Sequence, residues 1–163
     1  MDTATAWHRV LNDPQLRDLP YTVETNEHGQ IVLSPHKPRH GVRRAQIVRL
    51  LDRHLSSPGE AGVEFAVTTR KGVKVPDVVW ISAERLAEIP DDAEASPVMP
   101  ELVVEVVSEG NTEAEIAEKR ALYLDGGAQE VWTCAPDGTV TYSDVDGSRK
   151  ASALVPSFPD TID

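Results

Sequence analysis

Cysteine is nearly absent from this sequence of 163 residues, which contains only Cys134. A single thiol cannot form a disulfide within the chain or supply a cysteine-rich zinc site, and it is typical of a reducing compartment. No apolar run approaches the ~18 residues that a transmembrane helix needs, and residues 1–14 lack the apolar segment of a secretory signal. We therefore expect a cytoplasmic protein that does not enter the membrane.

Several chemical motifs are missing as well. The histidines show no zinc-ligand spacing on one helix, no glycine-rich phosphate loop occurs, and Ser108 lacks the context of a nucleophile elbow. Aromatic residues are few, with three Trp and three Tyr, which disfavours a sugar-binding cleft and hence a two-carboxylate glycosidase. The sequence therefore excludes or disfavours four common classes of hydrolytic site.

Positive charge is scarce overall, and the net charge of −11 argues against general affinity for nucleic acid. The charge is unevenly distributed, because residues 36–54 carry six Lys or Arg and one acid. A basic face of this kind can contact a phosphate backbone, and Arg39, Arg43 and Arg44 are its candidate contacts. The simpler interpretation is a solvated helix face.

Length and composition indicate one globular domain, with residues 1–19 as an extension and a core of about residues 20–160. The apolar patterns predict a mixed α/β fold, with an N-terminal β-hairpin and a mixed sheet flanked by helices. The helices are expected at residues 5–11, 40–55, 83–88 and 112–125. The strands are expected at residues 21–24, 30–33, 62–69, 75–81, 101–108, 130–134 and 139–143, followed by a turn at 144–149 and an extended segment at 152–155.

The segment PELVVEVV, residues 100–107, is the densest apolar stretch of the chain. Apolar residues at both alternating positions are typical of an interior strand that is covered on both faces. Glu105 interrupts this pattern. A buried carboxylate needs a cation, a metal ion or hydrogen-bond donors beside it, so Glu105 is the first candidate for a functional residue.

Asp77 is the second candidate, because it stands at the entry to the preceding predicted strand. If the two strands are neighbours, the carboxylates of Asp77 and Glu105 converge and repel each other unless something compensates. A hard divalent cation such as Mg²⁺ does so, and it also provides the polarisation that phosphodiester hydrolysis requires.

Lys119 is the third candidate, on helical geometry. It lies three residues after Ile116 and four before Tyr123, on one stripe of the predicted helix. If that stripe packs on the sheet, the ammonium points toward the carboxylates and can orient a water molecule or stabilise negative charge. The alternative is a surface lysine paired with Glu115, and spacing alone leaves both open.

Weaker candidates surround these three residues. Glu64 and Glu24 are possible further carboxylates, and His40 stands where a helix start can contact a phosphate or form a local cap. Glu130, next to Trp132, is expected to serve packing in an edge strand. For each of these residues the structural role is the simpler interpretation.

The ordered motifs resemble a known family. They are Val-Pro-Asp-Val-Val at 75–79, Pro-Glu-Leu-Val-Val-Glu-Val-Val-Ser at 100–108, Glu-Lys-Arg-Ala-Leu-Tyr-Leu at 118–124 and Gln-Glu-Val-Trp at 129–132. Together they are similar to the Uma-two-type family of "putative restriction endonucleases" within the PD-(D/E)XK nuclease superfamily. The likeness extends over roughly residues 20–160.

The resemblance implies a restriction-endonuclease-like core that binds Mg²⁺ or Mn²⁺ and acts on DNA. Asp77 matches the aspartate of the PD element, and Glu105 matches the acid of the (D/E)XK element. Val107 occupies the usual lysine position, so Lys119 in the next helix is the matching lysine.

The leading hypothesis is therefore a metal-dependent endonuclease in which Asp77 and Glu105 bind the metal and Lys119 orients the attacking water. The main alternative is a catalytically silent module with the nuclease fold that binds or regulates. A homodimer would provide the two active sites that cutting both DNA strands requires.

Overall fold

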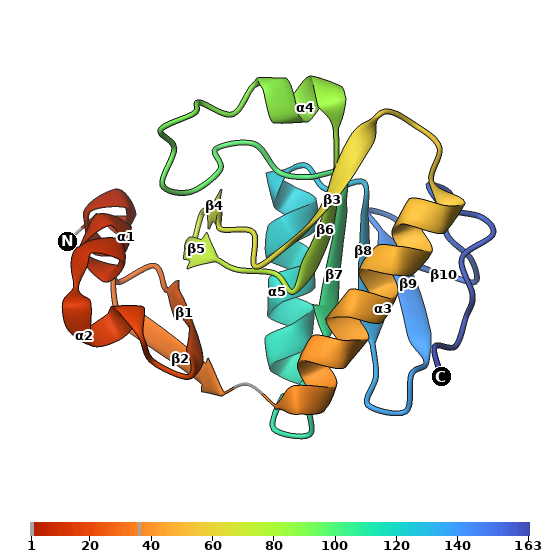
Figure 1. Cartoon of the computed structure of the whole chain (residues 1–163), viewed down its shortest axis with the longest axis horizontal. Helices are drawn as coiled ribbons and strands as arrows, with labels where there is room; N and C mark the ends of the chain where they lie inside the picture. The colour runs from red at the N-terminus through yellow and green to blue at the C-terminus, as the bar shows by residue number, and fades with distance from the viewer. Residues whose placement is uncertain (1, 36) are drawn as a thin grey trace.

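The computed structural model describes residues 2–35 and 37–163, and its elements form a mixed α/β arrangement (Figure 1). Six strands form the main sheet in the order β10-β9-β8-β7-β6-β3. Their bounds are Gly59–Val63 for β3, Val78–Ser82 for β6, Leu102–Val106 for β7, Glu130–Cys134 for β8, Val140–Asp144 for β9 and Gly147–Arg149 for β10. Strands β7 and β8 are parallel, and the other neighbours are antiparallel. The mixed sheet that the sequence predicts is confirmed.

Helices α3 (Pro38–His54) and α5 (Glu113–Gly126) cover opposite faces of this sheet (Figure 1). Alternate residues of β7 divide between the two faces, as the period of a strand requires. Leu102, Val104 and Val106 belong to the core cluster that includes Ile47 and Leu51 of α3. Val103 belongs to the cluster that includes Tyr123 of α5. Glu105 follows the alternation of Val103 and therefore faces α5.

Helix α5 connects the two parallel strands, which need a crossover of this length. Thr112 accepts a hydrogen bond from the backbone of Glu115, and the Glu115 side chain accepts one from the backbone of Thr112, which completes the predicted capping box. The helix ends where Gly127 adopts a left-handed conformation with φ of 115°. Both ends of α5 are thus determined by local sequence.

The N-terminal part contains α1 (Thr3–Asn12), α2 (Pro14–Arg17) and the predicted hairpin of β1 (Tyr21–Thr25) and β2 (Ile31–Pro35). The hairpin packs against a second small sheet of β4 (Val67–Thr69) and β5 (Gly72–Lys74). At Gly72, with φ of 92°, an added Cβ would lie 2.5 Å from the carbonyl oxygen of Thr25. The close approach therefore requires glycine there, and it brings β1 to the edge of the core.

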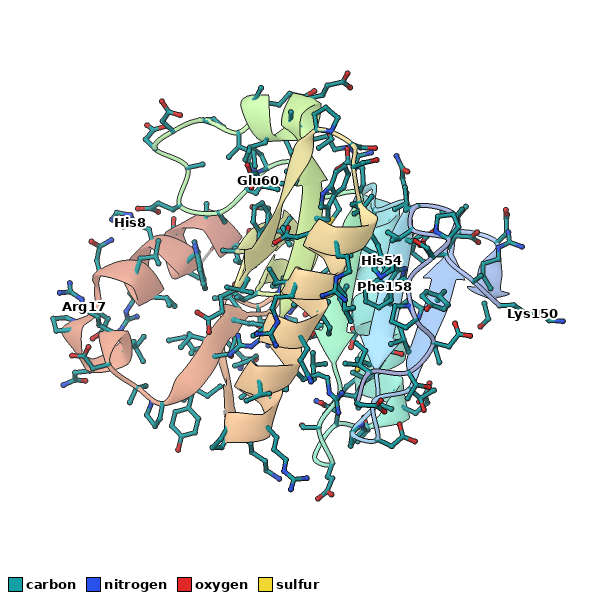
Figure 2. The ribbon with its side chains drawn as sticks, turned by 45° about the vertical axis from the view of Figure 1, so that its right-hand side comes forward. His8, Arg17, His54, Glu60, Lys150 and Phe158 are labelled. Atoms are coloured by element: carbon teal, nitrogen blue, oxygen red, sulfur yellow. The ribbon has the colours of Figure 1, made fainter. Side chains whose placement is uncertain are left out.

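The C-terminal segment lies against α3 and the sheet. Figure 2 shows Phe158 beside His54, and their ring centroids are 6.2 Å apart. The backbone of Val140 donates a hydrogen bond to the carbonyl of Asp160, at 2.8 Å. The segment thereby covers the face of the sheet on which Trp132 and Tyr142 lie.

Three expectations about strands were wrong. The strand expected at 62–69 is two strands, β3 and β4, because the chain breaks at Glu64, where φ is 49°. The strand expected at 75–81 begins only at Val78, after the separate strand β5. The expected turn at 144–149 contains β10. The short helix at 83–88 is present as α4 (Ala83–Ala87).

None of the helices in the described part of the chain is long and apolar enough to cross a membrane.

Candidate active site

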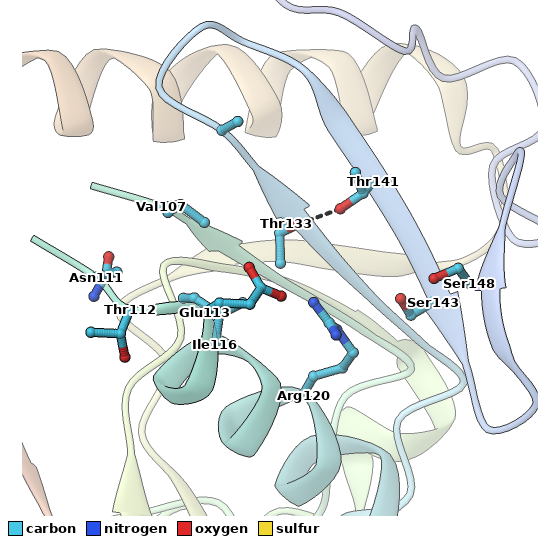
Figure 3. A pocket seen from close by; sticks show the side chains of 11 residues that line it. Val107, Asn111, Thr112, Glu113, Ile116, Arg120, Thr133, Thr141, Ser143 and Ser148 are labelled. Carbon is cyan, nitrogen blue, oxygen red and sulfur yellow. Dashed lines mark hydrogen bonds between the residues drawn. The ribbon is translucent and has the colours of Figure 1, made fainter. Parts of the chain in front are cut away.

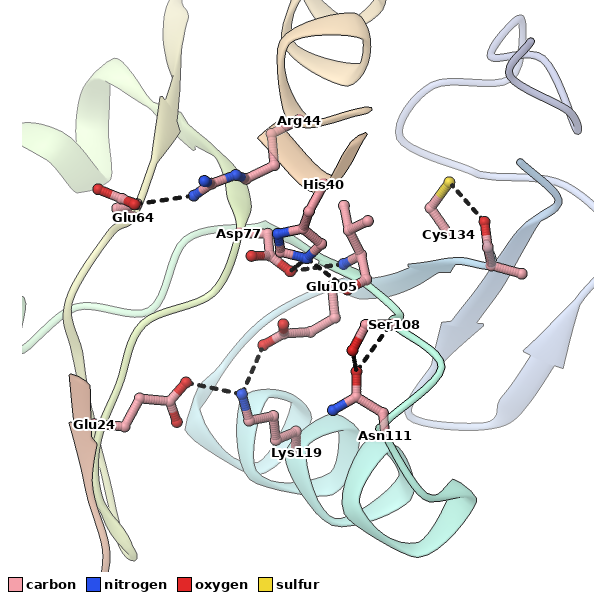
Figure 4. Close-up of polar contacts among 12 residues, drawn as sticks. Glu24, His40, Arg44, Glu64, Asp77, Glu105, Ser108, Asn111, Lys119 and Cys134 are labelled. Carbon is pink, nitrogen blue, oxygen red and sulfur yellow. Dashed lines mark hydrogen bonds and ion pairs between the residues drawn. The ribbon is translucent and has the colours of Figure 1, made fainter. Parts of the chain in front are cut away.

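Strands β6 and β7 bring Asp77 and Glu105 together. In their antiparallel register Val78 lies opposite Val104, so the preceding Asp77 and the following Glu105 form the next pair (Figure 4). Both side chains are buried. Two buried carboxylates on neighbouring strands repel when both are ionised, so one of them must be compensated or protonated.

Glu105 is the residue whose ionisation is disfavoured. Burial is the largest cause and, together with the charges of Asp77 and Glu24, outweighs Lys119 and Tyr123 and raises the pKa of Glu105 to about 8. The hydroxyl of Tyr123 donates a hydrogen bond to its Oε1 at 2.5 Å. Glu105 is therefore mainly protonated at neutral pH when no cation is bound.

Lys119 reaches the same place from α5. Its Nζ lies 3.5 Å from Oε1 of Glu105 and 2.8 Å from Oε1 of Glu24 (Figure 4). Burial lowers the pKa of Lys119, but the charges of Glu105 and Glu24 raise it by a larger amount. The net pKa of Lys119 therefore lies above its usual value. Glu115 is occupied in the capping box, so the alternative of a surface pair between Lys119 and Glu115 is wrong.

Asp77 is held by donors from two directions. The backbone N–H of Val106 donates to its Oδ2 at 2.8 Å, and Nε2 of His40 lies 3.4 Å from the same oxygen. Burial opposes ionisation of Asp77, but His40 and the hydrogen bond from Val106 hold its pKa below the usual value. The two carboxyls thus differ: Asp77 stays ionised, whereas Glu105 retains a proton.

His40 does not cap its helix, contrary to one of the expectations. Its Nε2 lies 2.9 Å from the carbonyl oxygen of Val106, and the hydrogen bond with Asp77 is the main reason that its pKa is raised. Its Nδ1 is buried without a partner among residues 2–35 and 37–163. His40 therefore orients Asp77 and the end of β7 rather than the start of α3.

Glu24 joins the cluster through the hairpin. It is buried in β1, and its neighbour Thr25 fastens the hairpin to β5. The Thr25 hydroxyl accepts a hydrogen bond from the backbone of Val73 at 2.9 Å, and Nζ of Lys74 donates to the Thr25 carbonyl at 2.8 Å. Burial lowers the pKa of Lys74. Glu24 therefore contributes a carboxylate to the cluster through its ion pair with Lys119, in addition to its packing in the hairpin.

The other predicted residues lie apart from this cluster. Glu64 has a side chain that is 56% exposed and pairs with Arg44 at 3.1 Å (Figure 4). Arg43 donates a hydrogen bond to the carbonyl of Ile162, and Arg39 is exposed at the start of α3. Two of the three arginines predicted to contact nucleic acid are thus engaged within the protein.

Glu130 was expected in an edge strand, and this expectation is wrong because β8 lies between β7 and β9. Its carboxylate accepts hydrogen bonds from Nε1 of Trp132 at 2.7 Å and from the Ser152 hydroxyl at 2.6 Å. The backbone N–H groups of Ala153 and Leu154 also donate to it, at 2.6 Å and 3.0 Å. Glu130 therefore attaches the C-terminal segment to the sheet.

Two members of the site were not predicted. The sequence predicts that Tyr123 lies on the inward stripe of α5, but it does not predict the hydrogen bond from Tyr123 to Glu105. The position of Tyr123 four residues after Lys119 is the signal that could have indicated this bond. Lys74 gave no signal, because its place beside Thr25 depends on the contact between β1 and β5.

Comparisons with known proteins agree with this architecture. A solved structure with 20% sequence identity, described as a "putative nuclease belonging to DUF820 from Anabaena variabilis ATCC 29413", superposes with a TM-score of 0.68 and covers 83% of this chain and 82% of that chain. The two proteins thus share the same mixed α/β fold. No curated protein matches the chain.

Residues 14–143 match the model of the Uma2 family, whose description is "Putative restriction endonuclease". The matched segment includes β1, both carboxylates and Lys119. The chain belongs to this family.

Proposed function

We propose that this protein is a metal-dependent endonuclease that hydrolyses DNA phosphodiester bonds, with Asp77 and Glu105 as ligands of Mg²⁺ or Mn²⁺. The observation that supports this most is the inward position of Lys119, 3.5 Å from Glu105, which itself lies beside Asp77. Two buried acids beside a partly buried lysine are costly for stability, and such costs are typical of functional sites.

The residues fit a divalent cation by their chemistry. No group of three or more His, Cys, Asp or Glu within residues 2–35 and 37–163 is arranged to hold a metal ion. Mg²⁺ does not need one, because it commonly binds through one or two carboxylates, waters and substrate phosphates. Burial, with the charges of Asp77 and Glu24 added, raises the pKa of Glu105, and a bound cation would favour its ionised form. When bound, the metal polarises a phosphoryl oxygen and lowers the pKa of a bound water.

Lys119 has a defined role in this proposal. Because its pKa is raised, it is an ammonium with three donors and no acceptor. It can therefore orient the attacking water and stabilise negative charge on the phosphate, but it cannot take the proton that the water loses. Glu24, at 2.8 Å, holds the ammonium in place. His40 keeps Asp77 ionised and fixes its orientation.

The alternative is a module that has the nuclease fold and binds or regulates without catalysis. The net charge of −11 favours it, as do the internal contacts of Arg43 and Arg44. The two functions differ in whether the pure protein cleaves DNA, and this difference can be measured directly.

The test combines metal titration with incubation of supercoiled plasmid in Mg²⁺ or Mn²⁺. We expect the wild type to nick the plasmid, Asp77→Asn to lose metal binding and cleavage, and Lys119→Met to lose cleavage while it still binds the metal. Double-strand cuts would be expected of a homodimer. Glu64→Gln is the matched control, because it removes a carboxylate outside the cluster and should cleave normally.

Two results would contradict the proposal. A wild-type protein that binds the metal but never cleaves DNA would favour the silent module. Metal binding that survives in Asp77→Asn and in Glu105→Gln would show that the cation binds elsewhere.

A further inference from the structure

A second polar site lies on the other flank of α5. A pocket of about 380 Å³ is lined by α5 and by the sheet face over β8, β9 and β10 (Figure 3). Thr133 of this pocket is the register partner of Glu105, so the pocket begins one strand away from the acid cluster. Lys119 is directed to one side of α5, and the next residue, Arg120, lines the pocket on the other side.

Arg120 is the unusual member of this pocket. It has no hydrogen-bond or ion-pair partner among residues 2–35 and 37–163, and its Nε is screened from solvent. A buried donor of a charged group that lacks an acceptor is costly, and such groups call for a bound partner. In Figure 3 the guanidinium extends from α5 into the space bordered by Glu113 and Thr133. The missing partner is therefore an acceptor inside the pocket.

The rest of the lining indicates the kind of acceptor. The hydroxyls of Thr133, Thr141, Ser143 and Ser148 come from three adjacent strands. Glu113 is the only acid among the lining residues. A guanidinium fork together with several hydroxyl donors suits the oxygens of a phosphate group, which accept hydrogen bonds in several directions.

We propose that this pocket binds a phosphate group, with Arg120 as the main donor and the hydroxyls of β8–β10 as the floor. The phosphate belongs either to a nucleic-acid backbone or to a small phosphorylated molecule. The site is separate from the Asp77–Glu105 pair and needs no metal, so it stands whether or not the protein is a nuclease.

The experiment is a titration with inorganic phosphate, in the presence of a metal chelator, followed by ¹⁵N–¹H chemical shifts of the full chain. We expect saturable shifts at the amides of Thr133 and Ser143. Arg120→Gln should weaken binding by about tenfold or more, because a hydrogen bond to a charged group is lost. Glu113→Gln should tighten it, because a like charge leaves the pocket. Arg9→Gln, an exposed arginine of α1, is the control for the loss of one positive charge.

The source of the phosphate is distinguished by two further probes, thymidine monophosphate and a short single-stranded oligonucleotide without terminal phosphates. If a backbone phosphate is the ligand, Arg120→Gln weakens the oligonucleotide as well; if a small molecule is the ligand, only the monophosphate and inorganic phosphate depend on Arg120. The proposal is overturned if these amides do not shift in the wild type, or if folded Arg120→Gln binds phosphate as tightly as Arg9→Gln.

Discussion

Glu105 and Glu130 are two buried glutamates on adjacent parallel strands, and their surroundings are opposite. Glu130 receives four hydrogen bonds from neutral donors, two from side chains and two from the backbone of the C-terminal segment. Glu105 shares its surroundings with Asp77, Glu24, Lys119 and Tyr123. A carboxylate that the protein itself satisfies serves the fold, whereas one that competes with other carboxylates is available for a ligand.

Replacing each glutamate with glutamine tests the difference between Glu105 and Glu130 most directly. Glu130→Gln should destabilise the protein by about 3 kcal/mol or more, because its amide group would face donors that it cannot accept from. Glu105→Gln should leave stability nearly unchanged below about pH 4.5 and should increase it at pH 7, where the folded wild type retains a proton that the unfolded chain has lost. Urea denaturation of both variants measures the difference, and equal destabilisation would contradict it.

The second effect concerns pH. The folded-state pKa of Glu105 is raised from 4.5 to about 8, so the folded state holds a proton that the unfolded state has lost between these pH values. Stability relative to Glu105→Gln should therefore fall as pH rises through this window, by up to about 1.4 kcal/mol per pH unit.

Metal affinity should also depend on the protonation of Glu105, but it should rise with pH where stability falls. If the cation requires the ionised carboxylate, its affinity should increase with pH up to about 8. Calorimetry in buffers of different ionisation enthalpy would then report about one proton released per metal below that pH. An affinity that does not depend on pH would separate Glu105 from the metal site.

The smallest expected effect comes from Tyr123→Phe. It removes a hydrogen bond to the charged form of Glu105, so the pKa of Glu105 should rise further and stability should fall by about 1 kcal/mol. The pH profile of metal binding should move upward. A variant that loses stability with an unchanged profile would assign Tyr123 to packing alone.

Local sequence determined a large part of this structure. The capping box of Thr112 and Glu115, together with Gly127, defined α5, and the apolar alternation of residues 101–108 defined β7. The spacing of Lys119 between Ile116 and Tyr123 indicated an inward lysine as one of two alternatives. These features depend on neighbours a few residues apart, so they can be read from periodicity and capping.

Only the tertiary structure decided which groups meet. Glu24 reaches Lys119 across 95 positions of the chain, because Gly72 allows β5 to approach Thr25. His40 reaches Asp77 because α3 begins beside the end of β7. The break at Glu64 sends that carboxylate to Arg44 and away from the cluster. Such contacts depend on strand order and on the packing of distant elements, which no local pattern records.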